Sequence, residues 1–463
     1  MQQGLSFIIS IFLARLLAPA DFGLIAMSLV VISMFQVFAD FGFASALINN
    51  KHNTSITYSS IFYFNIVVGV LLFIIFQFSA PAIGKFYKNE IVTELVRWLS
   101  FYFIIGSVNL VQRTILKRNI EFKKLTIRTI IAQVIGGIIG VVMAIKGFGV
   151  YALVAQNLSA ALINTIILWR IAEWHPKLEF SWSEIKKLTP YSAFIFFDNL
   201  LNVFFNRLDI IFIGKFFSAT TLGYYSRADS VTGLIERYSS ASVNKVFFPF
   251  LSRVEHNEEF LKIYFKVVSI ICFIAFGLGG ILLILSHEII TILFGSKWEP
   301  SVIMFQILIF RAVLYPVSSM MITAFLSRGK SRENFWIGIL RKAGMLLPFI
   351  AGYYYGLLVF LMARVGMSFI LTTANVLFSE RIIGASFTLH FRKIFEGAVV
   401  LLFFTMCYYL FLQDSTALIR VLGVIAYLGI YILFNWWVGN EGLIYLRKEL
   451  FVLLNKIRTT FHN

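Results

Sequence analysis

Apolar residues fill most of the chain in runs of about 20 residues, the length that a helix needs to cross the hydrocarbon core of a membrane. Short polar stretches separate the runs, and the longest of them, near 170–188, is too short for a soluble domain. The pattern predicts fourteen spans, at roughly 2–18, 24–48, 58–84, 91–112, 129–145, 148–169, 189–213, 222–250, 267–294, 302–326, 334–352, 357–379, 394–412 and 416–438.

The composition supports a membrane protein. Of the 463 residues, 59% are hydrophobic and 14% are charged, whereas soluble proteins have about 45–50% apolar and about 25% charged residues. A soluble chain of this length would form about three domains, and there is too little polar surface here to cover them. The low charge and the 51 Phe also exclude a disordered chain. The predicted fold class is therefore an all-α polytopic membrane protein with about 14 transmembrane helices.

Motifs for metals and nucleotides are missing from the sequence. The two cysteines, Cys272 and Cys407, lie in apolar runs, and the six histidines are scattered without the spacing of zinc ligands. No G-x-x-x-x-G-K-[ST] motif occurs, so we expect no ATP hydrolysis by this chain. We expect no cofactor and no enzymatic activity, and leave coupling to H+ or Na+ open.

Lysine and arginine alternate between successive connections. One set of connections holds 24 of the 40 basic residues, and the other holds only Lys85, Lys88, Lys146, Lys215, Lys297 and Arg420. Because basic loops stay in the cytoplasm, this predicts a multi-pass protein of the bacterial cytoplasmic membrane with both termini inside. The net charge of +17 then reflects orientation and attraction to anionic lipids. Nucleic-acid binding is the rival interpretation, but the basic residues are dispersed over separate loops.

The chain contains two weak internal echoes. Residues 16–23 (LLAPADFG) resemble residues 216–223 (FFSATTLG), 200 positions later, and residues 148–150 (FGV) resemble residues 355–357 (YGL). Repeated bundles are common in transporters, which bind their substrate between them. We therefore expect two six-helix bundles and two further helices, with boundaries at 1–180, 181–390 and 391–440, followed by a basic cytoplasmic tail at 441–463.

Residues 13–23 (LARLLAPADFG) resemble the opening of Wzx-type polysaccharide flippases. Residues 224–228 (YYSRA) and 248–253 (FPFLSR) are similar to the eighth span of the members that export colanic and teichuronic acid repeat units. The resemblance implies the multidrug/oligosaccharidyl-lipid/polysaccharide exporter fold, with the two bundles in a V. It also implies an undecaprenyl-pyrophosphate-linked oligosaccharide as the substrate.

Polar residues form stripes along several spans, each on one helical face. The seventh span carries Asp198, Asn202, Asn206 and Asp209, the eighth includes Asp229, Arg237 and Asn244, and the twelfth includes Arg364 and Asn375. Such residues can simply join helices by hydrogen bonds, but stripes on several spans together favour a wet internal cavity. Gly136 and Gly140 form a GxxxG pair that we interpret as a packing seam.

The implied pyrophosphate carries several negative charges, and arginine forms bidentate, permanently charged contacts with phosphate. The predicted substrate-binding residues are Arg15, which comes from the resemblance, together with Arg237, Arg311, Arg341, Arg364, Asn202, Asn206, Asn244 and Asn375. The candidates for ion coupling are Asp40, Asp209 and Asp229. The predicted partners are the lipid-linked oligosaccharide, anionic lipids, a polysaccharide polymerase and glycosyltransferases.

Two other functions stay open at this point. A polytopic glycosyltransferase or polymerase needs a catalytic acid or base near the membrane surface, and the acids in the outer connections are isolated: Asp21, Glu90, Glu299 and Asp414. A multidrug exporter of the same fold would favour an acidic, aromatic pocket for organic cations, whereas the excess of arginine in the stripes favours an anion.

Overall fold

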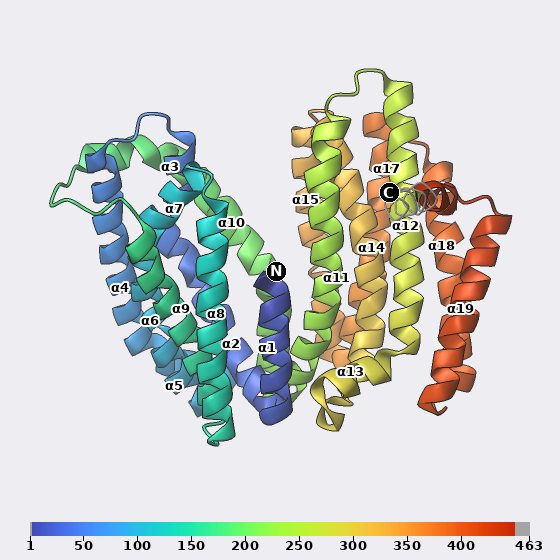
Figure 1. The fold of residues 1–463 in the computed structure, drawn as a ribbon, viewed down its shortest axis with the longest axis horizontal. Helices are drawn as coiled ribbons and strands as arrows, with labels where there is room; N and C mark the ends of the chain where they lie inside the picture. The colour runs from blue at the N-terminus through green and yellow to red at the C-terminus, as the bar shows by residue number, and fades with distance from the viewer. Residues whose placement is uncertain (1, 450–463) are drawn as a thin grey trace, which may run out of the picture. The chain divides into compact units, whose positions relative to one another are not determined.

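The computed structural model describes residues 2–449, with side chains described for 4–236 and 247–449. All regular structure in this part of the chain is helical, and the residues divide into two compact units, 1–226 and 227–463 (Figure 1). The predicted all-α fold class is confirmed. The predicted tail at 441–463 lies largely outside the described residues, although 441–449 are helical.

Ten helices make up most of unit 1. They are α1 (Gln2–Leu16), α2 (Pro19–Asp40), α3 (Phe43–Asn49), α4 (Ser55–Tyr87), α5 (Glu90–Leu99), α6 (Phe101–Ser107), α7 (Leu110–Arg118), α8 (Phe122–Ile145), α9 (Val150–Ile171) and α10 (Trp182–Phe216). The unit ends in the first turns of α11 (Ala219–Leu251). Helices α8 and α9 pack side by side, and α1 packs on α8 (Figure 1).

The predicted glycine seam lies between α8 and α9. A Cβ atom on Gly136 would stand 2.7 Å from the Cβ of Ala160, and one on Gly140 would stand 2.7 Å from the Cβ of Gln156. Only glycine allows the two helices to approach this closely, so the prediction is confirmed.

Unit 2 contains the remaining helices, which are the rest of α11, α12 (Asn257–Ile284), α13 (Ser286–Phe294), α14 (Ser301–Ser327), α15 (Ser331–Gly344), α16 (Leu347–Tyr355), α17 (Leu357–Ile383), α18 (Phe387–Cys407) and α19 (Ala417–Trp437). A short 3₁₀ turn spans Ser296–Trp298, and a π turn extends α18 through Tyr408–Leu412. Helix α12 contacts α14, α18 and α19. Its Gly280 lies against the ring of Tyr427, whose hydroxyl donates to the carbonyl of Phe276 at 2.7 Å.

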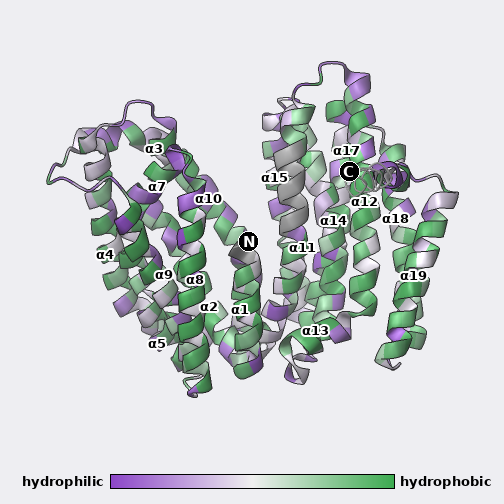
Figure 2. Ribbon diagram, viewed as in Figure 1, coloured by the Kyte–Doolittle hydropathy of each residue, from purple (hydrophilic) through white to green (hydrophobic). Residues whose placement is uncertain are grey.

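Apolar side chains dominate the long helices, and polar residues gather in connections such as that between α9 and α10 (Figure 2). Within the described residues, ten helices are long and apolar enough to cross a membrane, or eleven if the bent pair 90–107 and 110–118 is one span. The chain is therefore a multi-pass membrane protein. Each predicted span overlaps a helix, but the count of fourteen is not confirmed, because α10 and α11 carry many polar residues and α1 is short.

Helix α10, which we predicted to open the second bundle, packs against α2, α3 and α4 of unit 1. Its Glu184 accepts a hydrogen bond from Thr57 of α4 at 2.6 Å. Gly42 has a φ of +75°, and a Cβ atom there would stand 2.3 Å from the carbonyl oxygen of Ser192. The predicted boundaries at 180 and 390 divide the chain into six-helix membrane bundles rather than compact units. These boundaries stay a prediction.

Candidate functional site

A polar cavity of about 310 Å³ lies inside unit 1. A single water needs about 10–15 Å³ of such a cavity, so this cavity admits a much larger group. It is lined by Ser33, Gln36, Val37, Ala39 and Asp40 of α2, by Gly106, Asn109, Leu110 and Arg113 around the α6–α7 junction, and by Asn199 and Val203 of α10.

Helical spacing explains how these side chains converge. On α2, Ser33, Gln36 and Asp40 follow one another at three or four positions, so they share a face. Asn199 and Val203 do the same on α10. Each helix therefore presents one polar or small face to the cavity.

A bend between α6 and α7 brings the third wall into place. The axes of 90–107 and 110–118 differ by 48°, and Asn109 lies at the break. Its side-chain amide donates to the carbonyl of Ile105 at 2.8 Å and to Thr165 of α9 at 2.6 Å. Gly106 leaves room for Gln36, whose side-chain nitrogen would stand 2.5 Å from an added Cβ.

Two opposite charges line the cavity. Asp40, a predicted ion-coupling residue, ends α2, and its carboxylate accepts the backbone N–H of Ala44 at 3.1 Å. Arg113 is half-buried, and its Nε is buried without a hydrogen-bond partner among the described residues. A cavity with a carboxylate, a guanidinium and several amides can bind a polar, charged group inside an apolar bundle.

The other predicted residues of unit 1 do not line this cavity. Asn202 donates to Asp198 at 3.0 Å, one turn earlier on α10. Asn206 and Arg15 are exposed. Asp209 is buried and accepts a hydrogen bond from the hydroxyl of Tyr225 at 3.0 Å. Asp40 lines the cavity, together with Ser33 and Gln36 on the same polar face of the second predicted span.

In unit 2, Arg311 of α14 binds two carboxylates of α11. Its Nη2 lies 2.8 Å from Asp229, and its Nε lies 3.0 Å from Glu236. The Arg311 side chain is 15% exposed, and its two ion pairs compensate its charge within the fold. An anion would compete with these two carboxylates for Arg311, and its role in anion binding stays a prediction.

The remaining candidates of unit 2 are not gathered around a described cavity. Arg341 lies 3.4 Å from the side-chain oxygen of Asn334 on the same helix, and Arg364 lies 5.9 Å from the ring centre of Phe360. Asn375 is buried, and its side-chain oxygen has no hydrogen-bond partner in the described structure. The side chains of Arg237 and Asn244 lie outside the description.

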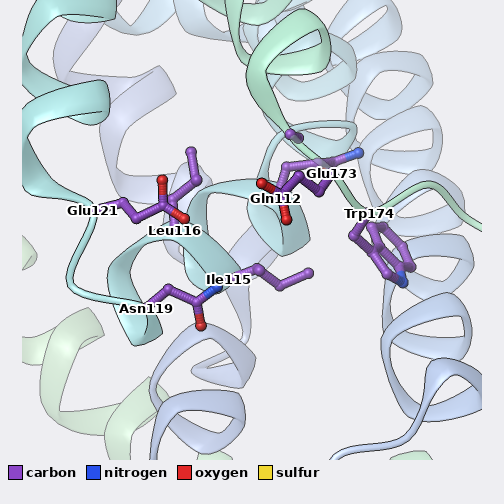
Figure 3. Close-up of a pocket in the computed structure, with 8 residues that line it drawn as sticks. Gln112, Ile115, Leu116, Asn119, Glu121, Glu173 and Trp174 are labelled. Carbon is purple, nitrogen blue, oxygen red and sulfur yellow. The ribbon is translucent and has the colours of Figure 1, made fainter.

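A second pocket adjoins α7 and the end of α9 (Figure 3). Its volume of about 20 Å³ is enough for one water. Both polar atoms of the Gln112 side chain are buried without a protein partner there. We interpret this pocket as a hydration site, because it is too small for a substrate.

Sequence reasoning missed Arg113, Asn109 and Asn199. The predicted span ends at residue 112, which places Arg113 in the basic connection that follows it. The helix continues to Arg118 after the bend. The spacing of Asn109 and Arg113, four positions apart, was the available signal. No group of three His, Cys, Asp or Glu side chains that could hold a metal ion occurs in the described part of the chain.

The sequence is similar to proteins that are named for the biosynthesis or transport of polysaccharides. It is 27% identical to the teichuronic acid biosynthesis protein TuaB of Bacillus subtilis (strain 168) over 320 residues, which cover 67% of this chain and 66% of TuaB. It is 25% identical to the succinoglycan biosynthesis transport protein ExoT of Rhizobium meliloti (strain 1021) over 345 residues, 73% of this chain and 69% of ExoT. The chain thus spans about two thirds of these relatives.

Among solved structures, the chain shares its fold with the lipid II flippase MurJ in an inward closed conformation. The TM-score is 0.75 at 14% sequence identity, and the match covers 94% of this chain and 97% of MurJ. An inward-facing MATE family transporter of the MOP superfamily matches with a TM-score of 0.66 over 83% of this chain and 95% of the transporter, at 14% identity.

One family model, described as polysaccharide biosynthesis protein, matches residues 12–303. This range is more than half of the 463 residues, and it includes the cavity of unit 1 and the helices that form it. The chain therefore belongs to the polysaccharide biosynthesis protein family.

Proposed function

We propose that this protein moves an undecaprenyl-pyrophosphate-linked oligosaccharide from the cytoplasmic to the outer leaflet of the bacterial inner membrane by alternating access. Membership of the polysaccharide biosynthesis protein family supports this function, and so does the fold that the chain shares with a lipid II flippase and a MATE transporter. The names of TuaB and ExoT associate those relatives with polysaccharide biosynthesis and transport.

The observation that carries the proposal is the polar cavity within an otherwise apolar helical unit. A charged side chain in the membrane is costly and usually faces a wet cavity or another charge. The head group of a lipid-linked sugar needs such a polar route, while its polyprenyl chain stays in the hydrocarbon. Gln36, Asn109 and Asn199 supply amide donors and acceptors suited to sugar hydroxyls.

We further propose that an ion gradient drives transport. Asp40 shares the cavity with Arg113, so binding of H+ or Na+ at the carboxylate would change the charge that the substrate meets. Glycosyltransferases would supply the lipid-linked substrate, and a polymerase would consume it after transport. Both termini of the chain would lie in the cytoplasm. A polytopic glycosyltransferase or polymerase and a multidrug exporter are the alternatives.

Deletion of the gene tests the function. A flippase mutant should accumulate complete lipid-linked oligosaccharide and lose surface polysaccharide, and the wild-type gene should restore both. A glycosyltransferase mutant would instead accumulate a shorter glycan, and a polymerase mutant would display single repeat units at the surface. Normal surface polysaccharide with raised sensitivity to organic cations would favour the multidrug exporter.

A further inference from the structure

Three basic side chains of unit 1 lie close together near the cavity. Arg113 and Lys117 are one turn apart on α7, and Arg128 is on α8. Helices α7 and α8 contact each other, and the charge of Arg113 acts on both Lys117 and Arg128. Lys117 also senses the charges of Asp40 and Arg128. Three positive charges therefore face one carboxylate.

None of these cations contacts a carboxylate within the described structure. Arg128 is 6% exposed, and its Nε, like that of Arg113, is buried without a hydrogen-bond partner. None of the three forms an ion pair or a side-chain hydrogen bond with another described residue. Buried charges without partners and like charges at short range both destabilise a fold, so stability does not explain this arrangement.

The neighbouring Arg118 shows the contrast. It follows Lys117 on α7, yet its guanidinium donates to the hydroxyl of Tyr58 at 2.6 Å and to the carbonyl of Lys51 at 2.9 Å. Arg118 therefore has a structural role in joining α7 to the start of α4. The other three cations have the charge of a binding site, and Arg113 also lines the cavity.

We propose that Arg113, Lys117 and Arg128 form a binding site for a diphosphate group at one end of the cavity of unit 1. Arg113 contacts the anion from the cavity wall, Lys117 contacts it from the exposed end of α7, and Arg128 adds fixed positive charge from behind. This inference rests on the proposed function, because the diphosphate is that of the lipid-linked substrate. The predicted topology places the site at the cytoplasmic side, where the substrate is loaded.

The test measures binding to the purified full-length chain in nanodiscs of zwitterionic lipid, with farnesyl diphosphate as the probe. Arg113→Gln should weaken binding about tenfold, as expected for a lost charge-assisted contact. Arg128→Gln should weaken it about threefold, because its charge acts without contact. Farnesyl monophosphate should bind more weakly than the diphosphate. The control Arg118→Gln should bind the probe as the wild type does.

Thermal unfolding separates a binding role from a structural one. Arg113→Gln and Arg128→Gln should keep or raise the melting temperature, because each removes like-charge repulsion. Arg118→Gln should lower it, because the bonds to Tyr58 and Lys51 are lost. A lower melting temperature in the first two variants, or unchanged binding in both, would overturn the site.

A further arm identifies the source of the phosphate. Phosphatidylglycerol added to the nanodiscs should not displace farnesyl diphosphate from the wild type. Complete displacement would assign the site to a membrane phospholipid and overturn the substrate assignment. Suppose that both arginine variants bind the probe as the wild type does, and that deletion of the gene still causes lipid-linked oligosaccharide to accumulate. This pair of results would refute the site and leave the proposed function intact. Arginine-dependent binding without such accumulation would refute the function alone.

Discussion

Arginines of this protein differ in what surrounds them, and this difference decides their roles. Arg311 binds Asp229 and Glu236, whereas Arg113 and Arg128 have no carboxylate partner within the described residues. A rule that treats each ionisable residue in a span as a site hypothesis selects Arg311 and Asp229 separately. It does not predict that they pair, because α11 and α14 are far apart in the sequence.

The ion pairs of Arg311 lead to a stability prediction. Arg311→Met should lower the free energy of unfolding by about 1–3 kcal/mol, because Glu236, at 17% exposure, loses a charge-assisted contact, while water screens Asp229, at 40% exposure. Melting temperature in detergent and abundance in the membrane measure this loss. The triple variant Arg311→Met, Asp229→Asn, Glu236→Gln should recover most of it. Full stability of Arg311→Met alone would show that the carboxylates do not depend on Arg311.

Helices α2 and α11 meet through the first sequence echo. A Cβ atom on Gly23 would stand 1.7 Å from the carbonyl oxygen of Ala219, and one on Gly223 would stand 1.9 Å from that of Pro19. Helix α2 begins at Pro19 and α11 begins at Ala219. Each glycine therefore packs against the first residue of the other helix, and the contact is reciprocal. The second echo agrees, since Gly149 and Gly356 both precede a helix with positive φ, at 54° and 90°. The echoes therefore share local features, and the relation between the two bundles stays a prediction.

This reciprocal contact predicts that neither glycine accepts a side chain. Gly23→Ala and Gly223→Ala should each lower the free energy of unfolding by about 3 kcal/mol, the upper part of the usual range for overpacking, because the opposing atom is backbone and cannot rotate away. Thermal melting of the purified protein measures the effect. The matched control is Gly4→Ala on α1, which meets nothing within 4 Å and should gain up to about 1 kcal/mol from helix propensity. Two alanine variants as stable as this control would contradict the contact.

Breaks inside the helices were beyond the reach of the sequence. The apolar run at 24–48 predicts one span, but the chain breaks between α2 and α3, where Gly42 meets the backbone of Ser192. The run at 91–112 likewise bends at Asn109, whose amide binds Thr165 of another helix. Hydrophobic periodicity reports which residues avoid water, whereas these bends follow from tertiary contacts. The cavity depends on the second bend, so the spacing of Asn109 and Arg113 puts them on one helical face but does not predict that this face lines a cavity.

On the scale of the whole molecule, the apolar runs and the alternation of basic loops predict a multi-pass helical protein, and the helices confirm it. The side of each loop is a prediction. Reporters fused after Lys51, Arg118, Lys187, Lys330 and Lys393 should report cytoplasm, because basic loops stay inside. Reporters at Lys88, Ser218 and Lys297 should report the outside. Two adjacent connections on the same side would contradict the fourteen-span topology.

The proposed function requires that this chain alone carries a lipid-linked oligosaccharide across the membrane. Its most direct test places the purified full-length protein in liposomes that contain an undecaprenyl-diphosphate-linked oligosaccharide and imposes an H+ or Na+ gradient across their membrane. The measurement is how much glycan a membrane-impermeant glycosidase can cleave. In protein-free liposomes the glycosidase should cleave only the glycan in the outer leaflet. With the protein present, we predict that the cleaved fraction exceeds this level and approaches completion, and that excess farnesyl diphosphate slows the cleavage. Cleavage that stops at the protein-free level, with intact liposomes and folded protein, would contradict the account.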